Sequence, residues 1–403
     1  MDIILIYWCR YNNCEMKILT VDIGTGTQDI YLYDSRLDIE NGLKLVVPSP
    51  TMILHRKLKA SARRGEAVLL EGVMMGGGPS AWGAEELLRQ GLAVYATPEA
   101  ARTFNDDLDM VREMGVQVLS KDEARKLPSR VLRLEMRDFD FDSIQSALQA
   151  FGVSLENLAA VAVAVFDHGD APPGISDRQF RFDYLDERIR NHNRLSAFAY
   201  QAPDVPSIMT RMQAVVQSVR NSGGILQDGI PLVVMDTAPA AVLGATFDPR
   251  VSSRHRVLIA NVGNFHTLSF RLGPEGIEGV FEHHTGLIDL PRLEELIRSL
   301  ADGSLKHTDV FDDHGHGALV YNPMPLALDA DEDFGVVVTG PRRGMLRGSN
   351  LRPYFAVPFG DMMIAGCFGL LSATADLLPD LGEQVRDSLN MAGGSGTPPW
   401  EVD

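Results

Sequence analysis

The chain has 403 residues, of which 45% are hydrophobic and 23% are charged, and its formal net charge at pH 7 is −17. A chain of this length exceeds one ordinary hydrophobic core, which predicts two domains. The excess of negative charge disfavours a broad nucleic-acid-binding surface. The three cysteines, Cys9, Cys14 and Cys367, fit neither a disulfide framework nor a zinc-binding spacing, so we expect a reducing, cytoplasmic compartment.

The N-terminal segment contains a short apolar run at residues 3–8, which is too short to span a membrane and lacks the features of a signal peptide. Met16 directly precedes a strong strand pattern. We therefore expect residues 1–16 to be a dispensable extension, with Met16 as the functional start. No other apolar run in the sequence approaches the length of a membrane span, so we expect no membrane partner.

The first predicted α/β unit opens with a β-meander in which a Gly/Thr turn follows the first strand. A long, nearly continuous apolar run later in the chain has the composition of a central strand that is buried on both faces. The predicted strands lie at residues 17–23, 29–33, 43–47, 158–166 and 230–235, and a helix is expected after Asp236.

A second, similar cycle begins near residue 256. Its meander is predicted at residues 256–261, 266–272 and 276–282, and Asp289 is expected to begin an amphipathic helix. The repetition predicts one domain at residues 17–250, with an inserted α/β segment, and a second at residues 251–378. We expect residues 379–403 to be a flexible tail, because this segment ends in a Gly-rich stretch.

A carboxylate at a strand end followed by small and hydroxyl residues suits phosphate chemistry. Asp22 stands in this position before Gly24, Thr25, Gly26 and Thr27. Small residues let backbone N–H groups approach phosphate oxygens, and a carboxylate holds Mg²⁺ directly or through water. By itself this segment is also compatible with a simple tight turn.

The ordered set of such segments resembles the superfamily of actin, sugar kinases and heat-shock chaperone ATPases. The resemblance covers roughly residues 17–378. Each motif is degenerate, so the resemblance rests on the order and spacing of the motifs. The segments are residues 21–27 for the first phosphate motif, 158–166 for the strand that faces the reacting phosphate, 236–245 for the first connecting helix, 261–267 for the second phosphate motif, 338–344 for the adenosine motif and 359–373 for the second connecting helix.

The resemblance implies an α/β fold of two ribonuclease-H-like domains with a cleft for ATP and Mg²⁺. Asp22 would organise the metal, and Asp236 would contact its water shell. Asp167 or His168 would orient or deprotonate the nucleophile. Two loops would clamp the phosphates and a third would hold the adenosine, with these residues: Gly24, Thr25, Gly26, Thr27, Asn261, Gly263, Asn264, Thr267, Gly340, Pro341 and Arg342.

The second phosphate motif departs from the superfamily pattern. An aspartate usually opens it, and here the position is Asn261, whose amide cannot ionise and cannot act as a base. Phe265 and His266 also replace small residues. These departures bear on hydrolysis more than on binding, and they suggest an unusual phosphate acceptor or ligand.

Within the superfamily, the chain resembles a prokaryotic family labelled as pyruvate formate-lyase-activating proteins. A radical activating enzyme needs a compact triad of cysteines for its iron–sulfur cluster. Cys9, Cys14 and Cys367 do not supply one, so we do not expect that chemistry.

Two other sites compete with the cleft. Residues 76–81, Gly-Gly-Gly-Pro-Ser-Ala, fit a dinucleotide-binding fingerprint, with Glu99 about 20 residues further on. The same loop is also compatible with a tight turn or with a second anionic ligand at the cleft. Histidines crowd the second domain and suggest a metal site or polar loops, with His283, His284, His314 and His316 as candidate ligands.

The preferred function is an Mg-ATP-dependent phosphotransferase or ATPase that acts on an unknown small molecule or protein. A nucleotide-gated activator or binding protein with little or no hydrolysis is the alternative, and a dinucleotide-binding protein that uses residues 76–81 is the third. The sequence leaves the acceptor and the oligomeric state open.

Overall fold

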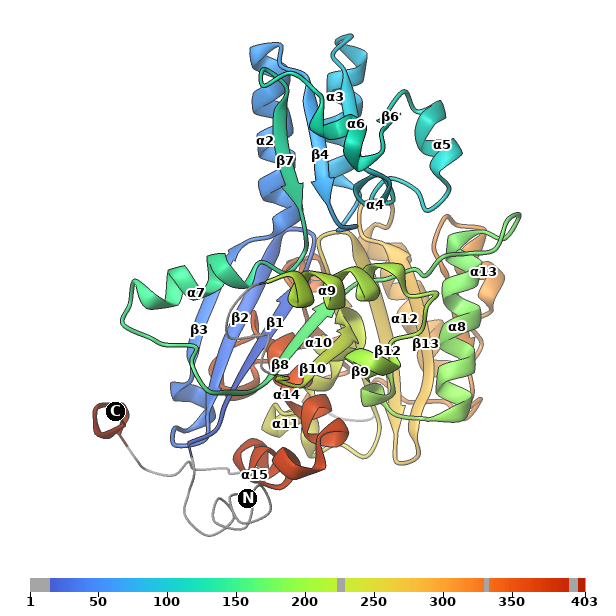
Figure 1. Cartoon of the computed structure of the whole chain (residues 1–403). Coiled ribbons are helices and arrows are strands. Elements are labelled where there is room, and N and C mark those ends of the chain that lie inside the picture. The colour runs from blue at the N-terminus through green and yellow to red at the C-terminus, as the bar shows by residue number, and fades with distance from the viewer. Residues whose placement is uncertain (1–14, 223–228, 330–332, 391–397, 403) are drawn as a thin grey trace.

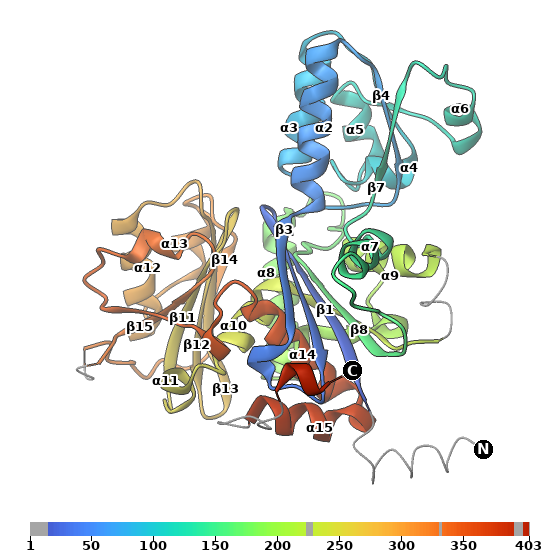
Figure 2. The same cartoon turned by 90° about the vertical axis from the view of Figure 1, so that its left-hand side faces the viewer.

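The computed structural model describes residues 15–222, 229–329, 333–390 and 398–402. Two large sheets stand side by side, and a smaller α/β unit rises above the first (Figure 1, Figure 2). Within the described ranges, no helix combines the length and the apolarity needed to cross a membrane.

The first sheet has the strand order β3-β2-β1-β8-β10-β9. Strands β1 to β3 form an antiparallel meander, whereas β8 runs parallel to both β1 and β10. The strands are β1 (Lys17–Ile23), β2 (Thr27–Asp34), β3 (Leu43–Pro48), β8 (Leu158–Val165), β9 (Ala199–Gln201) and β10 (Leu232–Asp236).

The second sheet repeats this pattern in the order β14-β13-β12-β11-β15-β16. Strands β11 to β13 form an antiparallel meander, and β15 runs parallel to both β11 and β16. The strands are β11 (Val257–Val262), β12 (His266–Gly273), β13 (Gly276–His284), β14 (Gly317–Val320), β15 (Val336–Thr339) and β16 (Pro353–Phe355). Without its extra edge strand, each sheet has the ribonuclease-H-like order 3-2-1-4-5, which confirms the predicted fold class.

The inserted unit lies between β3 and β8 in the chain and has its own parallel sheet, in the order β6-β5-β4-β7. Leu58, Leu70 and Leu87 belong to a separate buried core there. Its elements are α2 (Pro50–Arg64), β4 (Val68–Gly72), α3 (Pro79–Arg89), β5 (Val94–Ala96), α4 (Pro98–Ala101), α5 (Leu108–Glu113), β6 (Gln117–Val118), α6 (Lys121–Arg125) and β7 (Leu132–Met136).

Two helices, α10 (Thr237–Ala245) and α14 (Ala365–Leu377), cross between the large sheets (Figure 2). Glycines allow this crossing to be close. A Cβ atom at Gly244 would collide with the carbonyl oxygen of Ala365, and one at Gly369 would collide with that of Ala240. The crossing joins the two domains, and most residues of its helices lie in the segments predicted to be the two connecting helices, residues 236–245 and 359–373.

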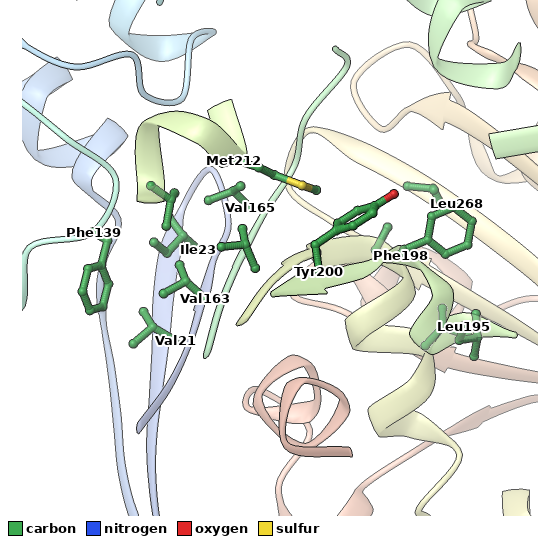
Figure 3. Packing of buried hydrophobic residues seen from close by; sticks show 14 of the residues in the cluster. Val21, Ile23, Phe139, Val163, Val165, Leu195, Phe198, Tyr200, Met212 and Leu268 are labelled. Carbon is green, nitrogen blue, oxygen red and sulfur yellow. The ribbon is translucent and has the colours of Figure 1, made fainter. Parts of the chain in front are cut away.

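The main apolar core fills the first sheet's outer face and continues into the second domain. Val21 and Val163 lie on neighbouring strands, and Phe198 lies beside Leu268 of β12 (Figure 3). This continuity helps to fix the two sheets relative to each other. The remaining helices are α7 (Phe141–Gln149), α8 (Asp177–Asn191), α9 (Thr210–Asn221), α11 (Pro249–Ser252), α12 (Leu290–Asp302), α13 (His307–Phe311) and α15 (Pro379–Asn390).

Both predicted chain ends need correction. Residues 379–390 form helix α15, which packs on α14 through the buried Val385 and Leu389, so the apolar spacing there is that of an amphipathic helix. Met16 is buried, and its amide donates to the Ser35 hydroxyl at 3.0 Å, so this residue belongs to the fold. Residues 1–14, 391–397 and 403 of the predicted extension and tail lie outside the described residues.

Candidate functional site

A pocket of about 110 Å³ lies between the two large sheets. The turns after β1 and β11, the segment after β15 and the N-terminal ends of α10 and α14 surround it. Most of the residues predicted from the sequence to bind the nucleotide line this pocket: Asp22, Gly24, Thr25, Thr27, Asn261, Gly263, Asn264, Gly340 and Pro341.

The two turns have the same backbone hydrogen bond. The Gly24 amide donates to the Thr27 carbonyl at 2.9 Å, and the Gly263 amide donates to the His266 carbonyl at 2.9 Å. The turns approach each other so closely that a Cβ atom at Gly26 would collide with the Asn264 side-chain amide. A ligand between them would therefore touch both domains.

Two carboxylates meet at the first turn. Asp22 is the penultimate residue of β1 and pairs in register with Asp29 on β2. Burial, chiefly, raises the pKa of Asp22 to about 7 and that of Asp29 to about 8, and the two charges repel each other. The Oδ1 atom of Asp29 is buried and has no hydrogen-bond partner in the described part of the chain.

These carboxylates fit a divalent cation. Mg²⁺ prefers carboxylate and water oxygens, and its charge would offset both the burial and the repulsion. Asp22 is already held in place, since the Thr237 hydroxyl donates to its Oδ1 atom at 2.5 Å. Gly366 in the first turn of α14 leaves room for the Asp22 carboxylate, with which a Cβ atom would collide.

The predicted adenosine loop only partly faces the pocket. Gly340 has φ of +94° and, with Pro341, lines the wall next to Asn261. Arg342 is exposed and contributes a backbone bond instead, because its amide donates to the Val262 carbonyl at 2.9 Å. Thr267, predicted to bind phosphate, is buried behind the turn and its hydroxyl bonds that of Thr285 at 2.9 Å.

Two predicted catalytic aspartates have both carboxylate oxygens occupied. Asp167 accepts hydrogen bonds from the amides of Gly169 and Met212, each at 2.9 Å. Asp236 caps α10 by accepting from the Ala238 amide at 3.0 Å, and it also accepts from Arg181 at 2.7 Å. Asp167 thus joins the end of β8 to α9, and Asp236 joins β10 to α8.

Arg181 also joins the two domains. Its Nε atom donates to the Oε2 atom of Glu282 on β13 at 2.7 Å, and both side chains are fully buried. The guanidinium lies 4.0 Å from the centroid of the Phe166 ring. Arg181 holds the pKa of Glu282 well below its usual range despite the burial of that carboxyl.

Four histidines gather beside this pair: His168 after β8, His266 on β12, His284 on β13 and His316 before β14. Of the predicted candidate ligands, the structure brings His284 and His316 together with His168 and His266, and it places His283 and His314 elsewhere. His266 pairs with His284 in the β12–β13 register, and strand alternation turns His283 to the opposite face, where it contacts the Asp313 carbonyl at 2.8 Å. His314 is exposed.

A second pocket, of about 530 Å³, lies between the inserted unit and the two large domains. The glycine loop at residues 76–78 lines it where β4 leads into α3, and residues 102–107 and 166–171 line other walls. The two pockets share Thr25, Phe166, Arg211, Phe265 and His266. The glycine loop thus lines a pocket that adjoins the cleft. A second anionic ligand at this loop was one of the alternatives predicted from the sequence.

Arg211 is the main site residue that the sequence did not reveal. It lies on α9, its side chain is 12% exposed, and it forms an ion pair with Asp138 at 2.7 Å. Asp138 in turn accepts from the Gly76 amide at 3.2 Å, so the arginine is linked to the glycine loop. Helix α9 has an ordinary amphipathic pattern, which gives no signal for a cation at the meeting point of two pockets.

Residues 75–345 match the family described as "Putative pyruvate format-lyase activating enzyme (DUF1786)". The chain belongs to this family. Its two sheets of ribonuclease-H-like order and the helices that cross between them have the topology that the sequence resemblance predicts. Cys367 of this family member is buried between α14 and β1, where burial raises the pKa of its thiol, and it lines neither pocket.

Two solved structures are among those that match the chain. The ethanolamine utilization protein EutJ from Carboxydothermus hydrogenoformans is 10% identical, with 88% of each chain covered and a TM-score of 0.28. MreB5 of Spiroplasma citri, bound to ADP, is 11% identical, with 92% of this chain and 99% of that chain covered and a TM-score of 0.29. A search of curated proteins finds no significant match.

Proposed function

We propose that this family member binds Mg-ATP in the cleft and acts as a phosphotransferase or ATPase. The observation that carries the proposal is the buried carboxylate pair, Asp22 and Asp29, beside two matching turns from opposite domains. In this role Asp29 replaces Asp236, whose carboxylate is engaged by Arg181.

Each part of the nucleotide has candidate contacts. The bound Mg²⁺ would neutralise phosphate charge. Asp22 and Asp29 would hold the metal, and Thr25 and Thr27 would donate to phosphate oxygens together with the turn amides. On the opposite side, Asn261 and Asn264 supply amides, and Gly340 and Pro341 provide a wall for adenosine.

The second pocket supports transfer to an acceptor. Arg211 and His266 lie where the two pockets meet, so a phosphoryl group at the inner end of the cleft would be near a ligand in the second pocket. Arg211 lines both pockets, and its guanidinium is held there by Asp138 and by the Phe166 carbonyl. The acceptor is proposed to be a small molecule, because the second pocket has a volume of about 530 Å³.

A nucleotide-gated protein with little hydrolysis is the second candidate function. Asn261 provides an amide where a carboxylate is usual, and both oxygens of Asp167 are engaged by backbone amides. With no carboxylate among these groups free to accept a proton, the cleft would close on the nucleotide and signal through the α10–α14 crossing.

A dinucleotide in the second pocket has mixed support. The glycine loop follows the carboxyl end of β4, an inner strand of the parallel sheet β6-β5-β4-β7, and dinucleotides bind at such strand ends. Against it, Glu99 does not line the pocket and instead pairs with Lys121 at 2.9 Å. In addition, a Cβ atom added at Gly78 would lie 3.4 Å from the Phe265 ring, so the loop already packs close to a side chain of the second turn.

The test is a calorimetric titration of Mg-ATP into the purified full-length protein. We expect saturable, micromolar binding that Asp22→Asn weakens at least about tenfold, which is about 1.4 kcal/mol. Asp142→Asn on the exposed face of α7 is the matched control and should leave the affinity unchanged. Equal affinity of Asp22→Asn and the wild type would contradict the proposed site.

Turnover then separates the two candidate functions. Release of phosphate, or transfer to an added small molecule, would support the phosphotransferase or ATPase. Tight binding of Mg-ATP without turnover would support the nucleotide-gated protein.

A further inference from the structure

The histidine cluster has the geometry of a metal site that is separate from the proposed magnesium site. His168 follows β8 in the first domain, whereas His266 begins β12 and His316 precedes β14 in the second. One nitrogen from each of these three rings lies within 4.8 Å of the other two. Nitrogen ligands of a tetrahedral zinc ion lie about 3.4 Å apart, given Zn–N distances of about 2.05 Å.

The nitrogen atoms point toward one another. The Nε2 atoms of His168 and His316 are 3.0 Å apart. His266 binds the Oε1 atom of Glu282 through Nδ1 at 2.8 Å, which leaves Nε2 as its second nitrogen. Only small adjustments are therefore needed for three nitrogens to surround one ion.

The carboxylate behind the cluster is a feature of histidine metal sites. A metal-bound histidine commonly donates its other ring N–H to a carboxylate, which fixes the tautomer and the ring orientation. Glu282 occupies this position for His266, and its Oε1 atom is 3.6 Å from Nδ1 of His316. Arg181 fixes Glu282 from the opposite side at 2.7 Å.

One further nitrogen of the cluster lacks a partner. The His316 side chain is fully buried. Nδ1 of His316 is buried and has no hydrogen-bond partner among the described residues. A metal at Nε2 of His316 would leave Nδ1 to carry the ring proton and to face Glu282, the arrangement that is common for metal-bound histidines.

We propose that His168, His266 and His316 bind one divalent transition-metal ion, with zinc as the best match to three imidazole ligands. Three protein ligands leave a fourth coordination position open. Both His168 and His266 line the second pocket, so the open position faces that pocket and suits an oxygen-donor ligand there. The ion would join the two large domains, because its ligands come from both.

The test is a titration of chelator-treated, full-length protein with Co²⁺ in excess Mg²⁺, which occupies the carboxylate site. We expect one equivalent to bind and to give the visible absorption bands of tetrahedral or five-coordinate cobalt. His168→Ala and His316→Ala should each lower the affinity at least about 100-fold, because each removes a ligand. Zn²⁺ should displace the cobalt and abolish the bands.

The exposed His192 provides a matched control, and His192→Ala should bind cobalt like the wild type. Asp22→Asn should weaken Mg-ATP binding and leave the cobalt affinity unchanged, so failure of this site and failure of the proposed nucleotide site are distinguishable. Circular dichroism checks that each variant is folded. Wild-type protein that binds no stoichiometric cobalt, or folded His168→Ala and His316→Ala variants that retain wild-type affinity, would overturn the proposal.

Discussion

The two turns that line the cleft have the same backbone hydrogen bond but differ in charge. Asp22 pairs with Asp29 across the first hairpin, and the corresponding pair across the second is Asn261 and Leu268. The first turn therefore presents two carboxylates, whereas the second presents an amide and a buried aliphatic chain. The two domains thus have matching turns, and only the first turn has the carboxylates proposed to hold a metal.

The helix crossing is what holds these unequal turns opposite each other. Gly244→Ala would force a methyl group into the carbonyl oxygen of Ala365, so we expect it to lower the free energy of unfolding by about 3 kcal/mol. Urea denaturation measures this. Gly286→Ala is the control, because no atom lies within 4 Å of its added Cβ, and it should change stability by less than about 0.5 kcal/mol. Similar losses in both variants would refute the close crossing.

The charge difference predicts unequal effects of matched substitutions. Asp22→Ala should weaken Mg-ATP binding about 100-fold, or about 2.8 kcal/mol, because the metal loses a ligand. Asn261→Ala should weaken it less than about tenfold, since only an amide contact is lost. Calorimetry on both variants compares them, and equal losses would show that the two turns contribute alike.

A carboxylate at position 261 would make the second turn resemble the first. We expect Asn261→Asp to raise ATP turnover about fivefold to tenfold, because an ionised group would then face the phosphates from the second turn. Steady-state phosphate release measures the change. An unchanged rate would mean that the amide at this position is not what limits hydrolysis.

The smallest expected effect concerns the contact between the inserted unit and the second turn. Trp82 lies 6.0 Å from Phe265, measured between ring centroids, and is 52% exposed. Its fluorescence should change when Mg-ATP binds, and Trp82→Phe should abolish that change while altering the affinity less than about threefold. Loss of binding in this variant would instead assign the inserted unit a direct part in holding the nucleotide.

Local patterns were enough to predict the duplicated sheets. The meanders, the buried central strands and the two Gly turns follow from apolar runs and turn residues, and these placed Asp22 and Asn261 at matching positions. Helix α15 was missed because the Gly-rich stretch beyond it outweighed the spacing of Val385 and Leu389.

The contents of the site depend on contacts that no local pattern encodes. The β12–β13 register brings His266 opposite His284, and the approach of the domains adds His168. Asp167 and Asp236 have the strand-end positions of catalytic groups, yet backbone amides and Arg181 occupy their oxygens. Only the three-dimensional structure distinguishes carboxylates that are bonded within the fold from those that face a ligand.

The central claim is that the first turn holds the metal of a bound nucleotide. Its most direct test is the affinity for ATP measured calorimetrically with Mg²⁺ and again with chelator in its place. The account predicts binding at least about tenfold tighter with Mg²⁺ in the wild type, and no such difference in the Asp22→Asn variant. Equal affinities with and without Mg²⁺ in the wild type would contradict it.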